Sequence, residues 1–288
     1  MCDELTAGDN EAAPAGATRR QFGIGMGAAS LALLLPSPAD AVPVTGRAVS
    51  VTTPDGTADA YFVAPTTGRH PGVLIWPDIM GLRPAFQQMA RRLAESGYAV
   101  LVVNQFYRST KAPFLKPGES YDQPAVRERI TPWRAALTPA AATSDGEAFV
   151  AWLDRQRQVD PRRGIAVTGY CMGGPMMMRT AAARADRVRA GASFHGAQLV
   201  SDSPDSPHRM VPEMKGGYLI AIAENDDARS PGDKDALRAA FTAVRVPAEI
   251  EVYEGAMHGW CPPDSRVYNE VQAERAWSRQ LALFTKHL

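Results

Sequence analysis

Short apolar runs alternate along the chain with longer segments that carry apolar residues three or four positions apart. The runs have the length of β-strands, and the longer segments have the period of amphipathic helices. The predicted strands span residues 48–53, 60–64, 72–76, 99–103, 164–168, 190–194, 218–223 and 248–253. The predicted helices span residues 84–96, 143–155, 175–185, 234–244 and 268–287.

The order of these elements predicts an α/β fold. The first two strands are separated by Pro54-Asp-Gly-Thr57, a turn sequence that favours an antiparallel hairpin. Strands and helices alternate after it, which indicates a mostly parallel, twisted sheet with an antiparallel N-terminal edge and helices on both faces. Ligand chemistry in such a sheet collects at the carboxyl ends of the strands.

The least regular segment spans residues 105–138, where aromatic residues are interspersed with prolines. Long irregular segments in compact domains are often lids or binding loops. The same aromatic residues could instead pack the segment against the domain, and the sequence leaves both interpretations open.

One segment carries the clearest chemical signal, Gly164-Ile-Ala-Val-Thr-Gly-Tyr-Cys-Met-Gly-Gly174. It predicts a buried strand that ends in a tight turn at Cys171 and continues as a helix, which is the nucleophile-elbow pattern with Cys in place of Ser. A thiol at a helix N-terminus is favoured as the thiolate. A small buried cysteine in a glycine-rich junction is the alternative interpretation.

A base and an acid follow in the chain order of α/β-hydrolases. His258 follows the predicted strand 248–253, and Asp226 and Asp227 follow the strand 218–223. All three therefore belong to the same edge of the predicted sheet as Cys171. Asp226 is the predicted acid, with Asp227 as the alternative.

Composition excludes several other classes of function. The chain has 288 residues, with 31 basic and 31 acidic side chains that cancel to a formal net charge of zero. The chain has no basic stripe with interleaved aromatic residues, the pattern that would indicate nucleic-acid binding. The side chains of Met176-Met-Met178 point in different directions around a predicted helix, which favours core packing over a copper site. The sequence also has no CxxC motif and no histidine pair of the kind that binds a metal. We therefore expect no cofactor.

The N-terminal residues 1–41 resemble an export signal. Arg19 and Arg20 precede Phe22, a short apolar run, and a small-residue boundary near Ala41. This pattern is typical of a twin-arginine signal. We therefore expect a single domain over residues 42–288, located in the periplasm or secreted, without a membrane contact in its mature form. Cys171 and Cys261 would be its only cysteines, too few for a disulfide framework.

Four motifs together resemble the dienelactone hydrolase family of α/β-hydrolases. They are Pro71-Gly-Val-Leu-Ile-Trp-Pro-Asp-Ile-Met-Gly-Leu82, Gly169-Tyr-Cys-Met-Gly-Gly174, Ala223-Glu-Asn-Asp226 and Gly255-Ala-Met-His-Gly259. The resemblance runs from about residue 48 to residue 288. The cysteine elbow is the most discriminating motif, since most α/β-hydrolases have serine there.

The resemblance implies an α/β-hydrolase fold and a Cys–His–Asp triad of Cys171, His258 and Asp226. It also implies an oxyanion hole formed by the backbone N–H groups of Met172 and Ile79. In the family a glutamate before the second donor holds the resting thiol, and this chain has Asp78 there.

Substrate contacts are expected from Tyr107 and Arg108, which lie in the irregular segment 105–138, and from Trp260, which lies two residues after His258. Arg108 lies near the position of an anion-binding arginine of the family, but aligning the two residues requires a gap of one residue. Pro262 stands where the family enzyme of chlorocatechol breakdown has its second arginine, so the sequence does not specify a dienelactone substrate.

The sequence thus predicts a monomeric hydrolase of a small ester or lactone, acting through a thioester. Two alternatives remain open: an exported binding protein on a hydrolase scaffold, and a redox role for Cys171 with Cys261.

Overall fold

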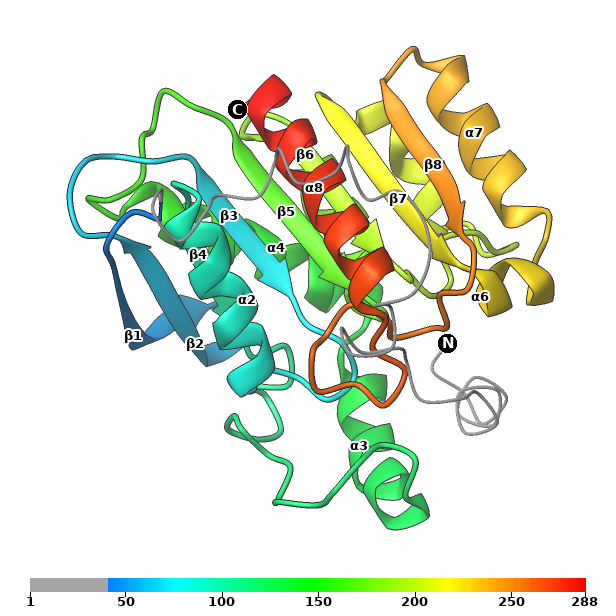
Figure 1. Cartoon of the computed structure of the whole chain (residues 1–288), viewed down its shortest axis with the longest axis horizontal. Helices are drawn as coiled ribbons and strands as arrows, with labels where there is room; N and C mark the ends of the chain where they lie inside the picture. Colours follow the sequence, from blue (N-terminus) through cyan, green and yellow to red (C-terminus); the bar gives the residue numbers. More distant parts are fainter. Residues whose placement is uncertain (1–40) are drawn as a thin grey trace, which may run out of the picture.

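The computed structural model describes residues 41–288, whose centre is one eight-stranded sheet in the order β1-β2-β4-β3-β5-β6-β7-β8 (Figure 1). The strands are β1 (Val44–Thr53), β2 (Gly56–Pro65), β3 (Gly72–Trp76), β4 (Ala99–Val103), β5 (Ile165–Tyr170), β6 (Val188–Phe194), β7 (Gly217–Ala223) and β8 (Ala248–Tyr253). β2 pairs antiparallel with both β1 and β4, and all other neighbours are parallel. The expected mostly parallel sheet with an antiparallel edge is confirmed.

Helices cover both faces of this sheet, as predicted. On one face α2 (Pro84–Glu95) and α8 (Glu270–His287) pack against the strands. On the other face lie α4 (Pro139–Asp154), α5 (Gly173–Ala183) and α7 (Asp233–Ala243) (Figure 1).

The burial pattern explains why these segments take these positions. Every residue of the central strands β3 and β4 is buried, because parallel strands are covered on both faces. Helix α2 begins with Pro84, which suits the first helical position, and buries one stripe that includes Phe86, Ala90 and Leu93. Thr138 and Asn269 cap α4 and α8 by accepting hydrogen bonds from backbone N–H groups.

The structure adds elements that the sequence pattern did not indicate. Helix α3 (Pro124–Ala136) lies inside the segment 105–138, carries Pro132 in its interior and buries only Val126 and Ile130. Such a weak apolar stripe with an internal proline does not predict a helix. A one-and-a-half-turn helix, α6 (Glu224–Arg229), and a 3-10 helix, η1 (Pro207–Glu213), are also new.

The segment 105–138, called the lid segment below, has a small hydrophobic cluster of its own. Ile79, Phe106, Val126 and Ile130 form its buried centre. Partly buried residues surround them: Met80, Phe114, Leu115, Tyr121, Trp133 and Met172. The cluster therefore joins the lid segment to the loop after β3 and to the turn after β5.

Residues 1–40, which include the twin-arginine motif, lie outside the described residues. Within residues 41–288, none of the helices combines the length and the apolar character needed to cross a membrane.

Candidate active site

Cys171 occupies a sharp turn between β5 and α5. Its φ of 53° lies in the left-handed region, which is unfavourable for a residue with a side chain and is typical of a nucleophile elbow. Cys171 N–H donates to Phe194 O at 3.1 Å, and Cys171 O accepts from Gly174 N–H at 3.0 Å. The backbone on both sides of the turn is thus held in place by hydrogen bonds.

Glycines are required on both sides of this turn. A Cβ atom on Gly169 would lie 2.0 Å from Gly173 O, and one on Gly173 would lie 2.3 Å from Trp76 O. Both contacts are with backbone atoms, which cannot move aside as a flexible side chain would. The sequence requirement for small residues two positions before and after Cys171 therefore follows from close backbone packing.

His258 and Asp226 contact each other directly at the end of the sheet. His258 Nδ1 lies 2.6 Å from Asp226 Oδ2, and the His258 side chain is almost fully buried. His258 N–H also donates to Asn225 Oδ1 at 2.8 Å, so α6 holds both the backbone and the ring of this histidine. The short helix α6, absent from the sequence prediction, is the element that brings the carboxylate to the imidazole.

Asp227, the alternative acid, has a different partner. Its two carboxylate oxygens each accept a hydrogen bond from Lys234 Nζ at 2.7 Å. Lys234 belongs to α7, on the face of the sheet opposite α8, so consecutive aspartates point to different elements.

The two expected oxyanion donors come from the loop after β3 and from the residue that follows Cys171. Ile79 lines the same cavity as Cys171, and Met172 directly follows Cys171. Within residues 41–288, neither the Ile79 N–H nor the Met172 N–H donates a hydrogen bond to another protein group. Gln105 Nε2 donates to Asp78 O at 2.7 Å in a buried contact, which fixes the loop that carries Ile79.

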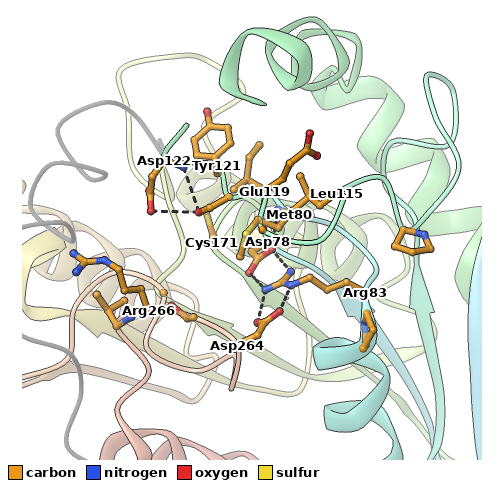
Figure 2. Close-up of a pocket in the computed structure, with 18 of the residues that line it drawn as sticks. Asp78, Met80, Arg83, Leu115, Glu119, Tyr121, Asp122, Cys171, Asp264 and Arg266 are labelled. Carbon is orange, nitrogen blue, oxygen red and sulfur yellow. Dashed lines mark hydrogen bonds and ion pairs between the residues drawn. The ribbon is translucent and has the colours of Figure 1, made fainter. Parts of the chain in front are cut away.

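Asp78 is held by an arginine that the sequence did not single out. Arg83 Nη1 and Nη2 donate to the two Asp78 oxygens at 2.7 and 3.0 Å, and Arg83 Nε donates to Asp264 Oδ2 at 2.7 Å. Burial opposes the charge of Arg83, but the two carboxylates outweigh it and raise the arginine pKa. Figure 2 shows this three-residue ion cluster beside Cys171.

Asp78 also accepts a hydrogen bond from Met80 N–H at 2.9 Å. Its carboxylate therefore closes a local turn as well as binding Arg83. Oδ2 of Asp78 accepts only one of these hydrogen bonds, so it keeps a lone pair that could accept a hydrogen bond from the Cys171 thiol, and the thiol-holding role remains a prediction.

A cavity of about 840 Å³ connects these groups. Cys171, His258, Ile79, Asp78 and Arg83 line it on the side of the sheet. The rest of the lining comes from residues 113 and 115–122 of the lid segment and from residues 264–267. Figure 2 shows Leu115, Glu119 and Tyr121 from the lid segment, and Arg266 from the loop after His258, around Cys171. The lid segment is thus a wall of the cavity.

The three expected substrate contacts do not line this cavity. The Tyr107 hydroxyl lies 2.6 Å from Thr53 Oγ1 and donates to Asp145 Oδ1 at 2.8 Å, and burial raises the Tyr107 pKa to about 12. Arg108 donates to the fully buried Asp145 and to Asp55. These residues fasten the start of the lid segment to α4.

Trp260 is fully buried beneath the histidine loop. Its ring stacks on Tyr253 with centroids 5.3 Å apart and meets the His195 ring edge to face at 5.1 Å. Its position indicates a packing role under the site.

His195 lines the cavity although the sequence analysis did not select it. It directly follows β6, as Cys171 follows β5 and α6 follows β7. The rule that strand ends carry the site would have identified it, because Ser193-Phe-His-Gly196 puts a histidine at a strand end. Its ring centroid lies 5.0 Å from that of His258.

Cys261 is an unpaired, buried thiol that does not line the cavity of Cys171. Burial raises its pKa well above the ordinary value, so its thiolate is strongly disfavoured. Among residues 41–288, no three His, Cys, Asp or Glu side chains gather in an arrangement suited to a metal ion.

The sheet, its two helical layers and the cysteine turn after β5 define an α/β-hydrolase fold. The chain belongs to the dienelactone hydrolase family, whose model matches residues 58–288. The fold and hydrolase class expected from the sequence are confirmed.

Individual relatives agree with this assignment. The chain is 25% identical over 278 residues to a protein of Escherichia coli K12 named "Putative carboxymethylenebutenolidase", covering 94% of this chain and 97% of that protein. It is 25% identical over 225 residues to the "Carboxymethylenebutenolidase" of Rhodococcus opacus, covering 77% and 83%. The crystal structure of a "Putative Dienelactone Hydrolase" from Klebsiella pneumoniae superposes with a TM-score of 0.73 at 23% identity, covering 85% of this chain and all of that one.

Proposed function

We propose that the protein hydrolyses a small ester or lactone through a thioester on Cys171. The observation that carries this proposal is the 2.6 Å contact between His258 Nδ1 and Asp226 Oδ2, because His258 lines the same cavity as Cys171. A thiol nucleophile, an imidazole and a carboxylate that orients the imidazole are the components of acyl transfer.

In the proposed reaction the Cys171 sulfur attacks the substrate carbonyl carbon, and His258 accepts the thiol proton. Asp226 holds the imidazole by its Nδ1–H and stabilises the imidazolium that forms. The N–H groups of Ile79 and Met172, which have no protein acceptor within the described residues, would bind the developing oxyanion. His258 then protonates the leaving alkoxide and activates a water molecule that cleaves the thioester.

The charges around the cavity are only partly paired, because Lys116 and Arg266 line it with no ion-pair partner among the described residues and can meet a polar or acidic group of a substrate. Asp78 and Asp264 share Arg83, and Glu119 is paired with Arg129. Arg108 is engaged by Asp145 and Asp55 instead of facing the cavity. The carboxymethylenebutenolidase names of the relatives support a lactone as one member of the substrate class, but recognition of a carboxylate by Arg108 would require its present pairs to break.

We further propose that residues 1–41 direct the protein out of the cytoplasm by the twin-arginine route. The support is the Arg19-Arg20 pair with its following apolar run.

The decisive experiment is capture of the acyl-enzyme. The protein is mixed with a slowly deacylating 4-nitrophenyl ester and examined by intact mass spectrometry, with peptide mapping of the added acyl group. We expect the acyl mass on Cys171, hydrolysis in the steady state, and neither in Cys171→Ala.

Two outcomes would favour the alternatives. Binding of an ester with no turnover would support a binding protein on a hydrolase scaffold. Acylation or turnover that persists in Cys171→Ala would place the chemistry on another residue. A redox pair of Cys171 with Cys261 is disfavoured because Cys261 is buried, unpaired and outside the cavity.

A further inference from the structure

His195 is a buried imidazole whose two nitrogens have no hydrogen-bond partner within the described residues. Leaving a buried polar group without a partner is unfavourable, so such a group in a native structure requires an explanation. Its φ of 42° adds left-handed backbone strain at the same residue. Strained residues of this kind cluster at functional sites.

The His195 ring contacts the ring of His258, and the loop that carries His195 packs against the backbone of the turn at Cys171. The two rings lie edge to face at a centroid distance of 5.0 Å. Ala197 N–H, two residues later, donates to Cys171 O at 3.2 Å, and a Cβ on Gly174 would lie 2.7 Å from Gly196 Cα. The loop after β6 is therefore packed against the elbow, and His195 lines the cavity beside it.

The surroundings of His195 keep its ring neutral. Complete burial is the main cause that lowers its pKa well below the ordinary value, and the neighbouring His258 acts in the same direction. A neutral imidazole offers one N–H donor and one lone-pair acceptor, without a charge that would attract a carboxylate. Rotation of the ring about its last torsion exchanges nitrogens for carbons within the same volume, so a nitrogen can be turned toward the cavity.

We propose that His195 is a specificity-determining residue that hydrogen-bonds a second, neutral oxygen in the acyl part of the substrate. This inference rests on the proposed function, because the acyl part is the portion that remains on Cys171 as the thioester. The substrate class is thereby narrowed to small esters or lactones that carry an ether, hydroxyl or carbonyl oxygen near the scissile carbonyl.

A matched pair of substrates tests this proposal. 4-Nitrophenyl butanoate and 4-nitrophenyl methoxyacetate differ by one oxygen in place of a CH₂ group in the acyl chain. We expect His195→Phe, which keeps an aromatic ring and removes both nitrogens, to lower the kcat/KM ratio of methoxyacetate over butanoate by about 3–10-fold. His195→Asn, which keeps a donor and an acceptor and tolerates a positive φ, should lose less of this ratio.

The controls separate the possible failures. Thermal unfolding shows whether each variant is folded, and His195→Ala replaces His195→Phe if the larger side chain prevents folding at this φ. Equal losses on both esters, or an unchanged ratio, would overturn the proposal and indicate that His195 only packs against His258. If the wild type hydrolyses neither ester, or Cys171→Ala is equally active, the proposed function fails and this inference fails with it.

Discussion

His258 Nδ1 lies 2.6 Å from Asp226 Oδ2, whereas the adjacent Asp227 is bound by Lys234. Two consecutive carboxylates thus have separate partners on separate elements. Only the first of them can orient the imidazole without a rearrangement of α6.

Replacing the two aspartates one at a time tests their proposed roles. We expect Asp226→Asn to lower kcat by on the order of 10²–10⁴-fold, because the imidazole loses its orientation and the imidazolium loses its counter-charge. Asp227→Asn serves as the matched control and should stay within about threefold of wild type in an ester-hydrolysis assay. The opposite ranking would assign the acid role to Asp227.

The glycines of the elbow predict a stability effect. Gly173→Ala should lower the free energy of unfolding by about 3 kcal/mol or more, because its Cβ would lie 2.3 Å from Trp76 O. Gly232→Ala is the control, since a Cβ there meets nothing within 4 Å and the backbone φ is −79°. Urea unfolding should place the control within about 1 kcal/mol of wild type. A tolerated Gly173→Ala would contradict the close backbone packing of the turn.

The Asp78–Arg83 pair leads to a prediction about thiol reactivity. Arg83 binds both oxygens of Asp78 but is shared with Asp264, so the three side chains keep one net negative charge beside Cys171. Asp78→Asn removes this charge, and we therefore expect it to raise the rate of Cys171 alkylation by iodoacetamide near pH 7. An unchanged rate would contradict the thiol-holding role that the family resemblance implies.

His195 predicts a dependence of stability on pH. Its pKa in the folded state lies well below 6.5, so the unfolded chain binds the proton first as the pH falls. The stabilisation is present above pH 6.5 and is lost progressively as the pH falls below this value. His195→Asn removes this titration, so urea unfolding at the two pH values should show a smaller loss for the variant. Equal losses of the free energy of unfolding in the variant and the wild type would show that His195 can be protonated in the folded protein.

Export can be tested with a conservative double substitution. Replacing Arg19 and Arg20 by lysine keeps the charge but removes the twin-arginine motif. We expect the variant to be retained in the cytoplasm of a bacterial host, measured by immunoblotting of cell fractions. Unchanged recovery from the periplasm would exclude this route.

The sheet was predictable because its strands are continuous apolar runs. The expected and observed bounds of β3, β4 and β8 coincide, and the remaining strands differ only at their ends. The chain order of cysteine, aspartate and histidine also placed these residues at one edge, since parallel strands carry their carboxyl ends to the same side.

The partners of the residues expected to contact substrate were not predictable, because they depend on which side chains meet across the fold. Arg108 pairs with Asp145 of α4, which lies 37 positions away in the sequence. Arg83 joins Asp78 to Asp264, which lies 181 positions away from it. No local pattern specifies such partners, and the weak apolar stripe of α3 concealed the helix that supports the cavity wall.

The small hydrophobic cluster of the lid segment contains Ile79 and Met172, the two residues with the proposed oxyanion donors, together with Phe106 and Trp133. Substitutions that reshape this wall for a different substrate will therefore also shift the proposed oxyanion donors. The wall cannot be exchanged between relatives as an independent module. A protein engineer would have to transplant the loop after β3 and the first turn of α5 along with it.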